Sequence, residues 1–194
     1  VMQQQLGFLV DAQHSLLNPE DLLMHWQPDG AIWYSHGCCS AGGDENTNYV
    51  DVVESNSSIA RVLDAVANLG AMIAPLPKTL LGAKKPLRAF IGQVEPTFDW
   101  TLRAETGQVL TDALVEAIYN RMHRSNPEPV GMAFHAVHQQ AGELFSQLDY
   151  LRRQVTRGNQ SAAIVAVRTQ LTALDWQSMV ILGDPTVAMP SLQP

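Results

Sequence analysis

Two stretches of the chain have the continuous apolar character of buried β-strands. The first runs from Ala31 to Tyr34, between Asp29-Gly30 and a later group of glycines, and the second runs from Leu87 to Val94. Short apolar runs bounded by turn residues are typical of strands covered on both faces. Because two strands do not form a stable sheet by themselves, we expect a missing or separate piece of chain to supply further strands.

Apolar residues spaced three and four apart predict helices along most of the remaining chain. Asn18 followed by Pro19 is a typical helix start, since asparagine caps and proline fits the first turn. The expected helices cover residues 2–17, 19–26, 58–70 (capped by Ser57 or Ser58), 76–81 and 109–118.

The last third of the chain predicts a helical hairpin. One apolar stripe runs from Phe134 to Val155, a second runs from Ile164 to Ile181, and Gly158-Asn159 separates them. Two such helices with a short joint fold back on each other, so we expect a hairpin over about residues 130–178. Helices combined with strands indicate an α/β domain, a sheet flanked by helices.

Composition narrows the classes of function. The 194 residues carry a net charge of −7 and contain 46% apolar residues, with no dense block of lysine and arginine. This pattern argues against nucleic-acid binding, and no apolar run reaches the roughly 20 residues that a membrane helix needs. The two cysteines are neighbours, and a bridge between neighbours is strained. We therefore expect free thiols in a reducing compartment, the cytoplasm.

The candidate chemistry lies just after the first strand, in the run His36-Gly37-Cys38-Cys39-Ser40-Ala41-Gly42-Gly43. Glycines allow a sharp turn and a close approach of substrate, and a thiol in such a turn can act as a nucleophile. The alternative is a pair of small core residues beside a turn.

This run resembles the nucleophile segment of the caspase-like cysteine peptidases, in particular their gingipain-like and CHAT branch. Two later stretches resemble the same branch in order and spacing: Leu87 to Glu95, and Met179 to Pro185 with its Leu-Gly-Asp-Pro ending. The resemblance implies a mainly parallel caspase-like sheet flanked by helices. It also implies that Cys38 is the nucleophile, that the Cys38 N–H is the oxyanion donor, and that no cofactor is needed.

The resemblance also implies a histidine base at the end of an earlier strand, and the 37 residues before Cys38 contain no strand followed by His-Gly. His14 and His25 fall in helical patterns. We therefore expect residues 1–194 to be the C-terminal part of one catalytic domain, whose N-terminal chain or segment carries the histidine. The other possibility is that His36, two residues from Cys38, is the base.

Carboxylates near the nucleophile are candidates for binding a basic side chain of a substrate. Asp44, Glu45 and Asp51 follow the cysteines, and Glu95 ends the second strand; for the first three, a solvated acidic loop is the competing interpretation. We expect no metal site, although His135, His138 and Glu143 are close in sequence. They lack the usual metalloprotease helix pattern.

Three hypotheses follow for the function. The first is an endopeptidase that cleaves protein or peptide substrates through Cys38. The second is an inactive scaffold of the same fold that serves in protein interactions. The third is a regulatory fragment whose helical hairpin binds a partner or its own second chain.

Overall fold

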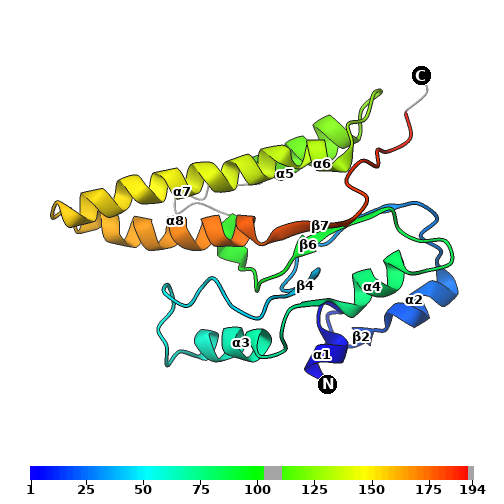
Figure 1. Cartoon of the computed structure of the whole chain (residues 1–194), viewed down its shortest axis with the longest axis horizontal. Coiled ribbons are helices and arrows are strands. Elements are labelled where there is room, and N and C mark those ends of the chain that lie inside the picture. The colour runs from blue at the N-terminus through cyan, green and yellow to red at the C-terminus, as the bar shows by residue number, and fades with distance from the viewer. Residues whose placement is uncertain (103–110, 192–194) are drawn as a thin grey trace. The chain divides into compact units, whose positions relative to one another are not determined.

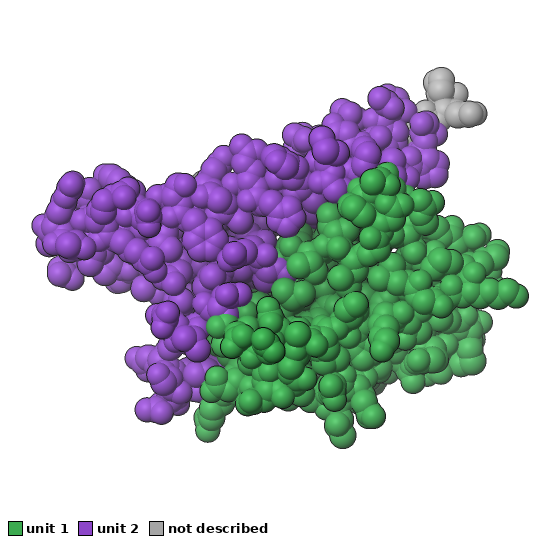
Figure 2. Space-filling view, in the orientation of Figure 1, with its two compact units in different colours: residues 1–47, 61–97, 179–187 green, residues 48–60, 98–178, 188–194 purple. Residues whose placement is uncertain are grey.

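The computed structural model describes residues 1–102 and 111–191, and the chain divides into two compact units. The first unit comprises Val1–Thr47, Arg61–Thr97 and Met179–Val187, and the second comprises Asn48–Ala60, Phe98–Ser178 and Ala188–Pro194 (Figure 2).

A three-stranded sheet forms the centre of the first unit (Figure 1). Its strands are β3 (Ile32–Tyr34), β6 (Ala89–Gln93) and β7 (Met179–Gly183), with β6 in the middle. β3 runs parallel to β6 and β7 runs antiparallel to it. Both expected strands are confirmed and the fold is mixed α/β, but the mainly parallel sheet is not shown, because one pairing is of each kind.

The core of this unit is built around Phe90 of β6, whose side chain is fully buried. Phe90 clusters with Leu76 and Leu80 of helix α4 (Pro75–Leu81). Trp33 of β3 stacks on Phe90 with 6.5 Å between ring centroids. Helix α2 (Pro19–His25) packs beside α4 and adds its half-buried apolar side chains to the same cluster.

The helix expected over residues 2–17 is wrong. Helix α1 covers only Met2–Gln5, and a hairpin of β1 (Leu9–Val10) and β2 (Leu16–Leu17) follows it. Gly7 has φ 72°, and the Asp11 side chain accepts hydrogen bonds from the backbone N–H groups two and four residues later. A left-handed glycine and an aspartate that caps a turn both compete with a helix.

The helix starts that the sequence predicts are confirmed. The Asn18 side chain accepts a hydrogen bond from the Glu20 N–H (3.0 Å) at the start of α2. The Ser57 hydroxyl oxygen accepts from the Ala60 N–H (3.0 Å) at the start of α3 (Ser58–Ala67). After α3 the chain forms β5 (Met72–Ile73), which pairs antiparallel with β4 (Gly42–Gly43).

The second unit contains the predicted hairpin, made of α7 (His135–Thr156) and α8 (Ser161–Gln177), which pack along each other (Figure 1). α8 ends at Gln177, and the apolar run that follows is strand β7 instead of more helix. The shorter elements of this unit are η1 (Asp99–Leu102), α5 (Asp112–Val115), the π-helix η2 (Glu116–Met122) and α6 (Val130–Ala133). Val109 and Leu110 of the expected helix 109–118 lie outside the described residues.

Trp176 of α8 is buried, with 3% of its side chain exposed. In residues 1–102 and 111–191, no helix has the combination of length and apolar character required to cross a bilayer.

Candidate active site

The two cysteines lie in a turn, residues 35–41, that begins where β3 ends; we call it the cysteine turn. Backbone hydrogen bonds tie it to the end of β6. The Cys39 N–H donates to the Glu95 carbonyl (3.1 Å) and the Ala41 N–H donates to the Gln93 carbonyl (2.8 Å). The turn thus lies at the carboxyl end of parallel strands, where ligands bind in α/β sheets.

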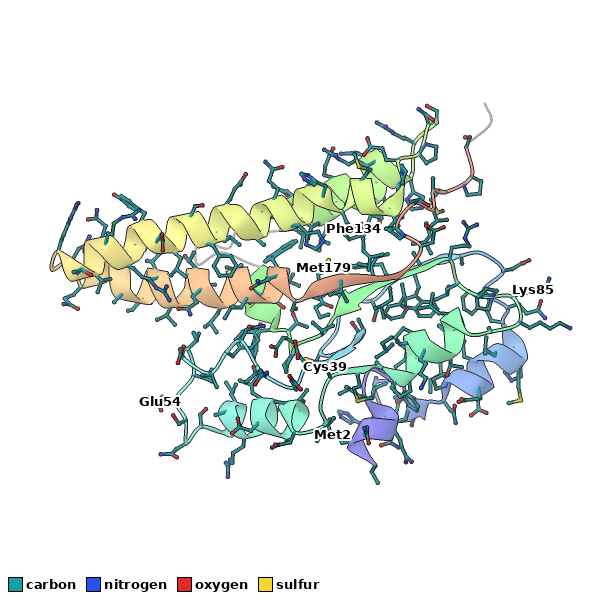
Figure 3. The ribbon with its side chains drawn as sticks, in the orientation of Figure 1. Met2, Cys39, Glu54, Lys85, Phe134 and Met179 are labelled. Carbon is teal, nitrogen blue, oxygen red and sulfur yellow. The ribbon has the colours of Figure 1, made fainter. Side chains whose placement is uncertain are left out.

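The environments of the two thiols differ sharply. Cys38 is exposed, and its thiol donates to the Thr97 carbonyl (3.2 Å). Cys39 is 2% exposed and has a left-handed backbone, with φ 53°. Burial raises the pKa of the Cys39 thiol to about 12, with further contributions from Cys38 and the Glu95 carboxylate. Only Cys38 therefore offers a thiol that an external molecule can reach (Cys39 is labelled in Figure 3).

The backbone N–H groups of the turn are also unequal. The N–H of Gly37 donates to the Gln93 side chain, that of Cys39 to the Glu95 carbonyl and that of Ser40 to the Gly37 carbonyl. Among the described residues, the N–H of Cys38 donates to no acceptor. An available N–H on the residue that carries the nucleophile is the arrangement an oxyanion hole requires.

Gln93, the last residue of β6, holds the turn through its side chain. It is 1% exposed, and its amide oxygen accepts from the Gly37 N–H (3.3 Å) and lies 3.4 Å from the Ser40 hydroxyl oxygen. Its backbone N–H donates to that same hydroxyl (3.0 Å). Gly92 makes this approach possible, because a Cβ there would lie 2.6 Å from the Ser40 oxygen.

The Gln93 amide also contacts His36. Since its oxygen faces the Gly37 N–H, its NH₂ group faces His36 Nδ1 at 3.0 Å. An NH₂ donor at Nδ1 is satisfied by the neutral tautomer whose proton is on Nε2. The Tyr34 hydroxyl lies 3.1 Å from the same Nδ1. The basic nitrogen of His36 is thus engaged in the structure of the turn, which does not favour His36 as the base for Cys38.

The structure separates the candidate carboxylates. Asp44 and Glu45 are exposed, and the Asp44 carboxylate accepts from the Glu45 N–H (2.7 Å). Glu95 is 4% exposed, accepts from the Thr47 hydroxyl (3.1 Å) and adjoins Cys39. Glu95 therefore contacts the cysteine turn, whereas Asp44 and Glu45 lie in a solvated loop. Asp51 is exposed as well, in the second unit.

The remaining histidines give no sign of a metal centre. His135 and His138 lie on α7, and the pKa of His138 is lowered by burial and by the nearby His135. The described part of the chain contains no group of three His, Cys, Asp or Glu residues placed to hold a metal ion. His14 lies in the β1–β2 hairpin and His25 ends α2.

Sequence reasoning missed the residues that brace the turn. Gln93 is the main one, and Tyr34, Ser40 and Thr47 support it or the neighbouring Glu95. A glutamine inside the apolar run 89–94 was the available signal, since a buried amide requires partners. The carbonyl of Thr97, which accepts from the Cys38 thiol, is a backbone group, so the sequence gives no such signal for it.

Comparison with known proteins gives no relative: no family model, curated protein or solved structure matches the chain.

Proposed function

We propose that Cys38 is the nucleophile of a cysteine endopeptidase of the caspase-like kind, and that residues 1–194 are the C-terminal part of its catalytic domain. The observation that carries the proposal is that Cys38 combines an exposed thiol with an N–H that donates to no described acceptor. No other described residue of the cysteine turn has both a reachable nucleophile and an available donor.

In the proposed reaction the Cys38 thiol leaves the Thr97 carbonyl and gives its proton to a histidine. The thiolate attacks the carbonyl carbon of a peptide bond, and the oxyanion accepts a hydrogen bond from the Cys38 N–H. The amine leaves with the proton that the histidine held, and a thioester forms on Cys38. Water, deprotonated by the same histidine, then releases the acid and restores the thiol.

The histidine is proposed to come from a separate N-terminal segment, because His36 Nδ1 is engaged by Gln93 and Tyr34. β3 pairs only with β6 in the described sheet, so its other edge is open. A parallel strand added there would end beside the cysteine turn, which is where the base is needed. The proposed partners are this segment and a protein or peptide substrate, without nucleic acid or membrane.

The reaction requires no cofactor, and a reducing compartment such as the cytoplasm suits a nucleophile that must remain a thiol. Both cysteines are free. For the choice of substrate side chain, Glu95 is the carboxylate we propose to influence a basic residue. Glu95 contacts the cysteine turn, whereas Asp44 and Glu45 lie in the loop beyond it.

The second candidate is an inactive scaffold of the same fold. It is favoured by one observation: among the described residues, the only hydrogen-bond partner of the Cys38 thiol is the Thr97 carbonyl, and no imidazole contacts it. The helical hairpin of α7 and α8 is the natural interaction element for this scaffold, or for the regulatory fragment considered as a third hypothesis.

The test is expression of the chain together with the sequence that precedes it in its gene, followed by assay against a mixed peptide library. We expect wild type and Cys39→Ala to cleave, and Cys38→Ala to lose at least a thousandfold of the rate. Cleavage by Cys38→Ala at the wild-type rate would refute the assignment of the nucleophile. A wild-type protein that folds, carries the upstream segment and cleaves nothing would establish the scaffold instead.

A further inference from the structure

All three lysines of the chain fall within eight residues, in a protein whose net charge is −7. Lys78 lies on α4, and Lys84 and Lys85 lie in the loop that follows it, where Figure 3 labels Lys85. Lys85 pairs with Asp29 at 3.5 Å, with both side chains more than half exposed. Lys78 and Lys84 form no ion pair with any described residue. Two of these three clustered lysines therefore have no counter-charge among the described residues.

These lysines line two adjoining hollows in the surface of the first unit. The larger one, of about 950 Å³, has walls from β5, α4 and α2, including Ile73, Pro75 and Lys78. The smaller one, of about 270 Å³, is lined by Lys84 and Lys85 among others. Leu23 and Ala83 line both hollows. We call the two hollows together the lysine groove.

The walls of the groove suit an extended peptide. Ile73 is 50% exposed and Leu23 is half-buried, so apolar surface faces the hollow. β5 pairs only with β4 in the described part of the chain, and both its residues, Met72 and Ile73, line the larger hollow. Open strand edges accept extended segments through main-chain hydrogen bonds, with neighbouring pockets selecting side chains.

The positions of the lysines define the charge and size of the occupant. α4 spans about 10 Å between β5 and the loop that carries Lys84, at about 1.5 Å per helical residue. An extended segment needs about three residues to cover that length at about 3.3 Å per residue, so a segment of six residues is long enough to reach both lysines. Carboxylates on such a segment would reach Lys78 and Lys84, the two lysines without an internal counter-charge.

We propose that the lysine groove docks an acidic, extended segment of a partner protein. Acidic side chains pair with Lys78 and Lys84, and intervening apolar side chains enter the hollow beside Ile73 and Leu23. The docking site is independent of the cysteine turn and of the proposed peptidase activity.

The experiment measures binding of the 194-residue chain to three fluorescein-labelled hexapeptides by fluorescence anisotropy. One peptide alternates glutamate with leucine, the second replaces glutamate by glutamine, and the third replaces it by lysine. We expect the glutamate peptide to bind at least tenfold more tightly than either counterpart. Equal affinity for the glutamate and glutamine peptides, or no binding of the glutamate peptide, would overturn the proposal.

Matched variants test the location. Replacing the three lysines by glutamine should weaken binding of the glutamate peptide at least tenfold. Replacing Arg152, Arg153 and Arg157 by glutamine removes the same charge from the helical hairpin and should change the affinity less than twofold. Ile73→Ser should weaken binding at least threefold and Ile164→Ser, also at an exposed site, should not.

Equal losses in the lysine and arginine variants would refute the groove as the site. Vesicles containing phosphatidylserine supply the alternative anionic surface. If they bind the chain through the same lysines and the glutamate peptide does not compete, the groove is a lipid site and the proposal fails. Thermal unfolding of each variant, within 2 °C of wild type, shows that losses come from binding and not from the fold.

Discussion

The two neighbouring cysteines should differ by orders of magnitude in their reaction with iodoacetamide. Alkylation requires the thiolate, and with a pKa of about 12 the Cys39 thiol is about one part in ten thousand ionised at pH 8. A cysteine with the ordinary pKa of 9.0 is roughly one tenth ionised at that pH. Ionisation alone should therefore slow Cys39 about a thousandfold relative to an unstructured cysteine peptide, and its burial at 2% exposure slows it further.

The assay is mass spectrometry of the folded chain after timed alkylation at pH 8. We expect one adduct per chain, on the exposed Cys38, and two adducts in 8 M urea. The variant Cys38→Ser isolates the slow reaction of Cys39, and Cys39→Ser isolates that of Cys38. Alkylation of Cys39 in the folded chain within tenfold of the unstructured peptide would refute the burial argument and, with it, the distinction between the two thiols.

The same buried thiol should make folding stability depend on alkaline pH. The pKa of Cys39 is raised from 9.0 in the unfolded chain to about 12 in the folded chain. The neutral thiol therefore contributes its full stability below pH 9, and this contribution is lost as the pH rises from 9 toward 12. The difference in unfolding free energy between wild type and Cys39→Ala should shrink by about 1.4 kcal/mol between pH 8 and pH 10. A difference that stays constant over this range, measured by urea denaturation, would contradict the shift.

Three further predictions concern stability and are measured by urea denaturation. Gln93→Leu should lower the unfolding free energy by about 2–3 kcal/mol, because it leaves the Gly37 N–H and the His36 Nδ1 atom without their amide partner. The control Gln139→Leu, at an exposed site of α7, should change the unfolding free energy by less than about 0.5 kcal/mol. Gly92→Ala should lower the unfolding free energy by about 1–3 kcal/mol, since its Cβ would lie 2.6 Å from the Ser40 hydroxyl oxygen. The control Gly142→Ala, which has open space around it on α7, should leave the unfolding free energy unchanged or raise it by up to about 1 kcal/mol. Asn18→Ala should cost about 1 kcal/mol through loss of the α2 cap; an unchanged stability would show that this helix start is held by packing alone.

Local signals in the sequence predicted the parts of the fold that short-range chemistry decides. The cap at Asn18, the proline that follows it at the start of α2 and the apolar runs of β3 and β6 all act within a few residues. The hairpin of α7 and α8 follows from apolar spacing and a glycine joint, and it is also confirmed.

The failures lie where distant contacts decide. At Gly7, a Cβ would meet Ala74 and the Cys39 carbonyl at 2.9 Å, so the left-handed backbone there reflects partners far along the chain. β7 was missed because its residues continue the apolar phase of α8, and only pairing with β6 makes them a strand. The third strand and the direction of its pairing were therefore beyond a reading of local pattern.

The candidate site likewise has features that the local sequence predicts and features that depend on distant contacts. The sequence singled out Cys38 as the reactive thiol, and the structure shows it exposed beside a buried Cys39. It placed Glu95 and Asp44 in one class, and burial separates them. The brace by Gln93 depends on a register between strands 57 residues apart, as the pairing of Trp33 with Phe90 shows, and no local pattern encodes that register.

The central position of β6 has a consequence for how the protein is made. Phe90 pairs with Trp33, 57 residues earlier, and with Leu182, 92 residues later. Pairings this remote in sequence assemble slowly, and on the ribosome β6 emerges long before β7 exists to cover its second edge. A nascent chain therefore presents a mostly apolar strand with one edge uncovered for the time needed to synthesise some 90 residues, a state prone to self-association. Chaperone supply during translation should govern the yield of this protein more than the stability of its finished fold.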